Sequence, residues 1–114
     1  MEKERFVPAK AFSPRGIEKA AAEVAKVLRA IANQRRLVIL CKLVEQREVN
    51  VGSLADAVGL SQSALSQHLA KMREERLVTY RRESQTLWYR IADARVEALL
   101  ASLYSLYCAP KKQR

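Results

Sequence analysis

The chain has 114 residues, 49% of them hydrophobic, with only three glycines and three prolines; this excludes a largely disordered chain and suits one domain around one core. Lysine and arginine number 21 against 12 acidic residues, so the formal net charge of +9 favours a polyanionic partner, nucleic acid ahead of a membrane surface. No stretch approaches the ~18 consecutive apolar residues of a membrane span, and no apolar segment typical of a secretory signal opens the sequence, so we expect a cytoplasmic protein with free cysteines.

The sequence divides into an arm, a domain and a tail. Residues 1–13 show no hydrophobic periodicity and are interpreted as a flexible basic arm. Ser13 and Pro14 are typical of a helix start, with the serine as the N-cap and the proline at the first helical position. The domain is expected over residues 14–108, followed by a basic tail over residues 109–114.

Two helices are predicted first. Apolar residues recur at helical spacing over Ile17–Ala32, which indicates an amphipathic helix. A second helix is expected over Gln34–Glu45, followed by a short extended piece at Val49–Val51. The buried face of this second helix is predicted to contain Leu37, Leu40, Cys41 and Val44, extended by Val38. On packing alone, Cys41 is either a small apolar core residue or a retained reactive thiol.

The most informative segment reads VGSLADAVGLSQSALSQHLAKMREERLV. Ser53, with Asp56 three residues later, is interpreted as the N-cap of a short helix that ends at Gly59. Ser61 is predicted to cap a second helix that runs to about Glu75. Two short helices joined by a three-residue turn with a glycine are typical of a helix-turn-helix.

The hydrophobic period then changes from 3.6 to 2. VTYRRE and TLWYRI alternate apolar and polar residues around Ser84 and Gln85, which predicts a β-hairpin. Ala92–Cys108 is predicted as a last helix with a wide apolar face. The fold class is therefore mainly α with a small β-hairpin: a winged helix-turn-helix whose flanking terminal helices carry surplus apolar surface and are expected to form a homodimer.

A DNA-reading face is predicted on the second helix of the helix-turn-helix. Leu65, Leu69 and Met72 are expected to pack inward, which leaves short polar and basic side chains outward. Gln67 suits adenine, and Lys71 suits a phosphate or guanine. The candidate DNA-binding residues on this helix and in the hairpin are Ser61, Gln62, Ser63, Ser66, Gln67, His68, Lys71, Arg81, Arg82 and Arg90. The alternative is an ordinary solvated surface.

These residues resemble the ArsR/SmtB family of bacterial winged-helix repressors. LADAVGLSQSALSQHLAKMREERLV is similar to the family's helix-turn-helix, RRLVILCKL to its second helix, and the hairpin to its wing, so the resemblance extends from about Glu18 to Cys108. It implies a homodimer that binds an inverted-repeat operator in double-stranded DNA and releases it when an inducer binds.

The resemblance also indicates which kind of inducer the regulator senses. Positions that carry Cys-x-Cys in arsenic and cadmium sensors are Asn50–Gly52 here, and the last helix, whose acidic residues are Asp93 and Glu97, lacks the histidine of zinc and nickel sensors. The chain is instead similar to the persulfide-responsive BigR/SqrR-type branch, with cysteines at matching places in LVILCKLV and LYSLYC. This implies that Cys41 and Cys108 sense persulfide or polysulfide and become bridged by a disulfide or polysulfide.

The sequence is also compatible with other inducers of the regulator. The two thiolates are also a ligand pair for a soft metal ion such as Cu(I), and a repressor responding to general thiol oxidation is a related alternative. A thiol-disulfide enzyme is disfavoured because the sequence has no Cys-x-x-Cys. No catalytic residue, cofactor site, metal site or membrane contact is predicted.

Overall fold

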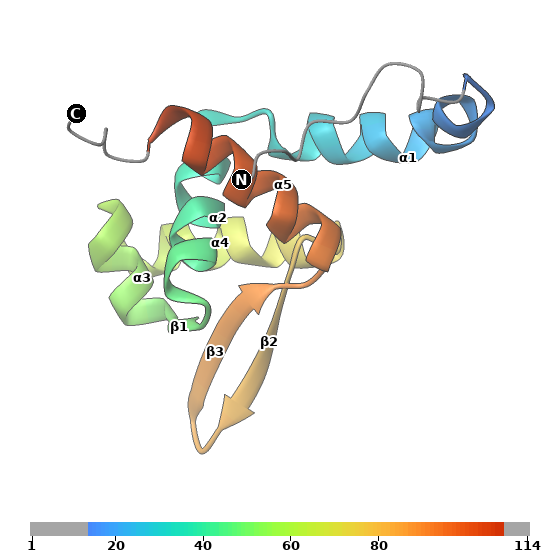
Figure 1. Ribbon diagram of the computed structural model, residues 1–114. Helices are drawn as coiled ribbons and strands as arrows, with labels where there is room; N and C mark the ends of the chain where they lie inside the picture. The colour runs from blue at the N-terminus through green and yellow to red at the C-terminus, as the bar shows by residue number, and fades with distance from the viewer. Residues whose placement is uncertain (1–13, 109–114) are drawn as a thin grey trace, which may run out of the picture.

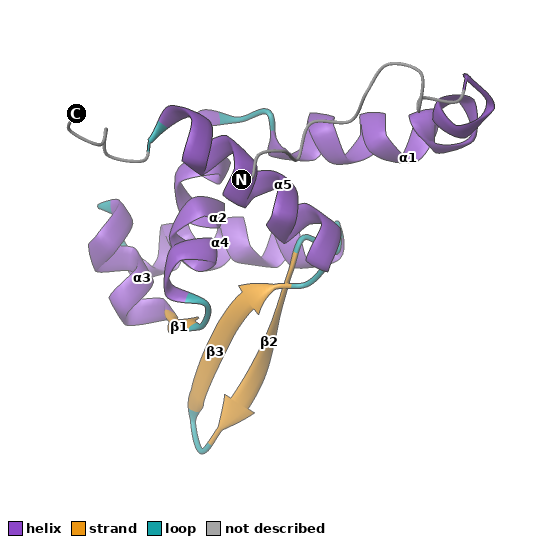
Figure 2. Ribbon diagram, viewed as in Figure 1, coloured by secondary structure: helices purple, strands orange, loops and turns teal. Residues whose placement is uncertain are grey.

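The computed structural model describes residues 14–108, and Figure 1 shows how their helices and strands are arranged. The predicted arm, tail and Ser13 cap lie outside the described residues. Within this range the elements follow in the order α1 (Pro14–Ile31), α2 (Gln34–Gln46), β1 (Val49–Asn50), α3 (Val51–Val58), α4 (Gln62–Glu74), β2 (Val78–Glu83), β3 (Thr86–Ile91) and α5 (Ala94–Tyr107). The mainly helical winged helix-turn-helix predicted from the sequence is confirmed (Figure 2). No helix in this range is long and apolar enough to cross a membrane.

The wing is part of a three-stranded antiparallel sheet with the order β1-β3-β2. The hairpin strands have the predicted bounds, and Val78 lies opposite Ile91 at the base. The predicted extended piece becomes β1, where Val49 lies opposite Tyr89. This third strand fixes the start of the helix-turn-helix to the middle of β3, while the tip of the hairpin extends away from the helices (Figure 1).

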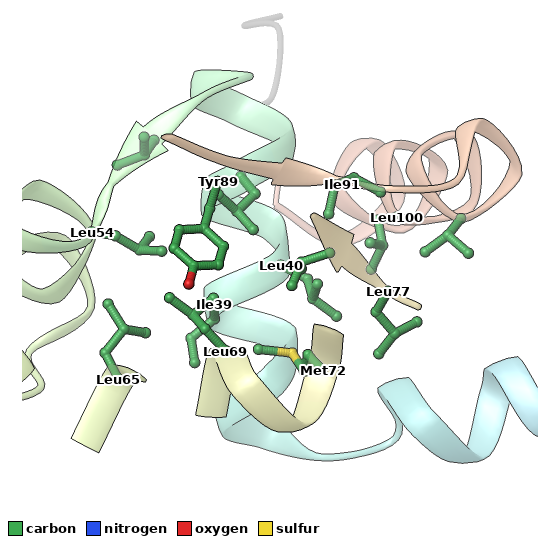
Figure 3. Close-up of a cluster of buried hydrophobic side chains, with 14 of the residues drawn as sticks. Ile39, Leu40, Leu54, Leu65, Leu69, Met72, Leu77, Tyr89, Ile91 and Leu100 are labelled. Atoms are coloured by element: carbon green, nitrogen blue, oxygen red, sulfur yellow. The ribbon is translucent and has the colours of Figure 1, made fainter. Parts of the chain in front are cut away.

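A single apolar core lies between α2, α3, α4, α5 and the base of the sheet. Leu40 of α2 is fully buried among Leu69 and Met72 of α4 and Leu100 of α5, which all belong to the same cluster (Figure 3). Helix α5 packs directly on α2. The core thus joins the element that carries Cys41 to the one that ends at Cys108.

The predicted buried face of the second helix is right for Leu40 and wrong in its orientation for the rest. Leu40 is fully buried together with Ile39 and Leu43. Leu37, Cys41 and Val44 are only half-buried, and Val38 is exposed. The buried sector is rotated by roughly one residue, about 100° around the helix axis. The reason is that apolar residues occupy most of the circumference of α2, so their spacing alone does not determine which sector its neighbours cover.

The helix caps correct a second expectation. Asn50, not Ser53, is the N-cap of α3, because its side chain accepts the Ser53 backbone N–H at 2.8 Å and places the serine inside the helix. Gly59 ends this helix as predicted, with a left-handed φ of 72°. Ser61 caps α4 as predicted and accepts the Ala64 N–H at 3.1 Å. The last helix begins later than expected, because Asp93 is its N-cap.

The terminal helices leave apolar side chains uncovered. Helix α1 projects from the body of the domain (Figure 1), and Ile17, Val24 and Leu28 on it are exposed. Tyr104 and Tyr107 are exposed on the last turns of α5. These surfaces belong to the two elements that the sequence analysis assigned to a homodimer.

Candidate DNA-binding surface and cysteine pair

Helix α4 separates its apolar side from its polar side. Leu65, Leu69 and Met72 are fully buried, as the helical spacing predicts. The predicted DNA-contacting residues of α4 and its cap are exposed except for His68, which is half-buried at the border of the two sides; the exposed ones are Ser61, Gln62, Ser63, Ser66, Gln67 and Lys71. Their hydroxyl, amide and ammonium groups form a solvent-facing polar surface that suits the edges of bases and the phosphates beside them.

The arginines of the wing lie on different faces and differ in pairing. Arg81 lies opposite Trp88 and donates to both carboxylate oxygens of Glu48, at 2.9 and 3.0 Å. Its positive charge is therefore largely offset within the protein. Arg82 lies on the opposite face of β2 near the tip and is exposed, as is Arg90. Neither has an ion-pair partner within residues 14–108, so both are available to a phosphate.

Helix α4 also contacts the wing directly. The Arg73 guanidinium lies 4.8 Å from the centre of the Tyr80 ring on β2, and Tyr80 packs against Tyr89 with ring centres 5.2 Å apart. Such cation–π and aromatic contacts fix the hairpin relative to the helix. The two surfaces that the sequence analysis assigned to DNA therefore belong to one packed unit.

The two cysteines belong to two helices that pack on each other, α2 and α5. Cys41 is half-buried on α2 against the core, and Cys108 is exposed as the C-cap of α5, where its N–H donates to the Tyr104 carbonyl at 2.7 Å. Burial raises the pKa of the Cys41 thiol, and negative charge on Cys108 raises it further. Both thiols are free.

Lys42 and Asp93 are each paired with another residue. Lys42, next to Cys41 in sequence, binds Glu45 at 2.9 Å. Among the acidic residues of the last-helix region, Asp93 caps α5 and binds Arg95. Within residues 14–108 there is no group of three or more histidine, cysteine or acidic residues that could hold a metal ion.

A helix-turn-helix with a polar outer face, followed by a wing with exposed arginines, defines a DNA-binding transcriptional regulator. Residues 33–80 match the sequence model of the family described as bacterial regulatory protein, arsR family. The transcriptional activator HlyU of Vibrio cholerae is 47% identical over 92 residues, which cover 81% of this chain and 84% of that protein. The chain belongs to the ArsR family.

Two solved structures extend this comparison. Reduced HlyU from Vibrio cholerae N16961 has a TM-score of 0.75 at 45% identity, covering 83% of this chain and 99% of that chain. The transcriptional repressor BigR from Xylella fastidiosa has a TM-score of 0.76 at 36% identity, covering 87% of this chain and 100% of that chain. Relatives of this chain are thus named both as activators and as repressors, and they are regulators rather than enzymes, as predicted.

Some contacts of this site were not predicted from the sequence. Asn50 is a residue type that caps helices, and its position directly before the apolar residues of α3 was a usable signal. The pairing of Glu48 with Arg81 had no such signal, because the two residues are far apart in the chain and meet only through the sheet.

Proposed function

We propose that this protein is a homodimeric repressor that binds an inverted-repeat operator through α4 and the wing, and releases it when persulfide or related sulfane sulfur bridges Cys41 and Cys108. The observation that carries the proposal is the direct packing of α5, which ends beside Cys108, on α2, which carries Cys41. This packing brings two parts of the chain together whose cysteines lie 67 positions apart in the sequence (108 − 41). The similarity to BigR supports a repressor, and the related structure described as reduced HlyU supports a thiol-based signal.

The chemistry begins at the exposed thiol. The Cys108 thiolate attacks the terminal sulfur of a persulfide RSSH, which displaces the thiolate RS⁻ and leaves Cys108 as a persulfide. The Cys41 thiolate then attacks Sγ of Cys108, forms the disulfide and expels hydrosulfide. Two thiols are oxidised and the persulfide is reduced to a thiol and hydrogen sulfide, so no further oxidant is needed. A second persulfide molecule would supply the extra sulfur of a trisulfide in the same way.

The bridge would act on DNA binding through α5. It ties the end of α5 to the middle of α2, and a direct disulfide holds the two Cα atoms within about 7 Å. Because α1 and α5 carry most of the exposed large apolar side chains, a shift of α5 would change how two copies of the chain are held together. An operator fixes the two recognition helices about one helical turn apart, so a small change in their spacing lowers affinity.

The test combines DNA binding with intact mass. An operator fragment selected from random duplex DNA is titrated before and after treatment with glutathione persulfide, hydrogen peroxide or Cu(I). We expect persulfide to bridge the two cysteines and lower operator affinity, whereas Cys41→Ser and Cys108→Ser each bind before treatment and stay bound after it. The single variants serve as each other's matched control.

Each contrary outcome points to a different signal. Release by Cu(I) with no covalent change would favour a soft-metal regulator that uses the thiolate pair. Equal release by peroxide and persulfide would favour a general thiol-oxidation sensor. If either single variant is released as readily as the unmutated protein, the cysteine pair is not the sensor.

A further inference from the structure

Arg36 joins three helices at one point. It lies in the first turn of α2, and its guanidinium donates to both carboxylate oxygens of Glu75, with Nη1–Oε1 at 2.8 Å and Nη2–Oε2 at 3.1 Å. Glu75 is the C-cap of α4. Nη1 also donates to the carbonyl of Ala30 at 2.9 Å, in the last turn of α1. One side chain therefore connects the end of α1, the start of α2 and the end of α4.

This ion pair differs from an ordinary surface pair in geometry and burial. The Arg36 side chain is only 15% exposed, against 42% for Glu75. The two parallel hydrogen bonds fix the orientation of both groups as well as their distance, which a single contact does not. The Ala30 carbonyl belongs to the last turn of a helix, where backbone acceptors lack partners within the helix, and Arg36 supplies one.

The negative charge of Glu75 is unfavourable at its position for two electrostatic reasons. A carboxylate at the C-terminus of a helix meets the negative end of the helix dipole, and one close to a DNA-binding helix repels phosphates. The hydrogen bonds and charge of Arg36 stabilise it and hold the pKa of Glu75 below its usual range. The pair thus keeps a negative charge at a place where DNA binding alone would disfavour it.

We propose that Arg36 is a positioning residue for DNA recognition, whose bidentate hold on Glu75 fixes the orientation of the recognition helix α4 relative to α1 and α2. This inference rests on the proposed reading of DNA by α4. Arg36 contacts the far end of α4 from its N-terminal serines and Gln67, so it acts through the helix and not through the DNA. Loss of the pair would let α4 tilt and misalign the side chains that reach base edges.

The decisive comparison is between Glu75→Gln and Glu74→Gln. Both remove one negative charge at the end of α4, but Glu74 is exposed and has no ion-pair partner within residues 14–108. Charge alone predicts tighter binding to all DNA for both variants. If Arg36 positions α4, Glu75→Gln lowers the ratio of operator affinity to random-DNA affinity by about tenfold, comparable to the loss of one base contact, while Glu74→Gln leaves that ratio unchanged.

The arginine side of the pair gives an independent test. Arg36→Lys keeps the positive charge but cannot form the two parallel hydrogen bonds to Glu75. We expect the same decrease in the ratio of operator affinity to random-DNA affinity, without a change in the salt dependence of random-DNA binding. Arg35→Lys is the matched control, since Arg35 is an exposed neighbour without an ion-pair partner in the described range. It should preserve both the affinity ratio and the salt dependence.

The outcomes separate this inference from the proposed function. Equal ratios for Glu75→Gln and Glu74→Gln, or an unchanged ratio in Arg36→Lys, would overturn the positioning role of Arg36. Gln67→Ala reports on α4 itself, because a base-reading glutamine must lower the ratio when it is removed. If Gln67→Ala leaves the ratio of operator to random-DNA affinity unchanged, base reading by Gln67 fails, whatever the Arg36 variants do. Thermal unfolding of each variant identifies any that do not fold.

Discussion

The two cysteines differ in how much solvent reaches their sulfurs. Cys41 is half-buried against the core, while Cys108 is exposed at the end of α5. Burial disfavours the thiolate of Cys41, and so does a thiolate at Cys108, because both raise the pKa of Cys41. Because the thiolate is the nucleophile, exposure assigns the first attack to Cys108 and leaves the closing step to Cys41.

The raised pKa of Cys41 predicts the pH dependence of its alkylation. At neutral pH the folded protein holds a smaller fraction of Cys41 as thiolate than an unfolded chain does, so iodoacetamide should react more slowly with the folded Cys41. The midpoint of its rate against pH should lie above that of the denatured protein. Peptide-resolved mass spectrometry measures the rate at each cysteine separately.

Removal of the neighbouring thiol provides the control for this measurement. In Cys108→Ser the like charge is gone but the burial of Cys41 remains, so the midpoint should move only part of the way back. A folded midpoint at or below that of the denatured chain would contradict the burial and like charge that surround Cys41.

Single residues also show where sequence analysis reaches its limit. The polar face of α4 was predictable, because Leu65, Leu69 and Met72 fix by their spacing which side is buried. The hold of Arg36 on Glu75 was not, since the partners lie 39 positions apart and no local pattern connects them. Their contact exists only because α2 and the end of α4 meet in the folded domain.

Among the elements, those with a narrow apolar side were predicted best. The hairpin strands have the predicted bounds because an alternation of period 2 leaves only one register that buries Val78, Tyr89 and Ile91. Helix α2 was oriented incorrectly because it is apolar nearly all round and its neighbours α3, α5 and β3 decide which side is deepest. The hydrophobic periodicity of a segment therefore indicates whether it is a helix or a strand more reliably than it indicates which side of the element faces the core.

The turn of the helix-turn-helix depends on the backbone of one glycine. Gly59 has φ of 72°, and a Cβ added there would meet no atom within 4 Å. Gly59→Ala should therefore cost about 1 kcal/mol of unfolding free energy from backbone strain alone, without a steric clash. Chemical denaturation measures the loss, and Gly59→Asn should lose less because asparagine tolerates the left-handed region better.

Gly52 provides the opposite control in the same motif. It lies inside α3 with ordinary contacts for an added Cβ, 3.5 Å to Gln62 and 3.6 Å to Asn50. Gly52→Ala should therefore stabilise the domain by roughly 0.5–1 kcal/mol, as alanine does in a helix. If both alanine variants change stability in the same direction, backbone conformation is not what distinguishes the two glycines.

At the scale of the whole molecule, most of the uncovered large apolar side chains lie on the two terminal helices. Ile17, Val24 and Leu28 project from α1, and Tyr104 and Tyr107 from the end of α5. A lone domain would leave these apolar groups in water. Pairing two chains through α1 and α5 would cover them and double the net charge of the assembly.

The proposed dimer predicts that a charge introduced on α1 strongly weakens operator binding, although no proposed DNA contact is changed. Leu28 is 46% exposed, so Leu28→Glu should fold but give monomers in sedimentation. A monomer engages only one half-site, and the loss of the second should weaken operator binding by about a hundredfold or more. Val38→Glu is the matched control, since Val38 is also 46% exposed but lies on α2, and it should stay dimeric and bound. A monodisperse monomer of the unmutated chain at micromolar concentration, or dimers of Leu28→Glu, would show that α1 does not form the interface.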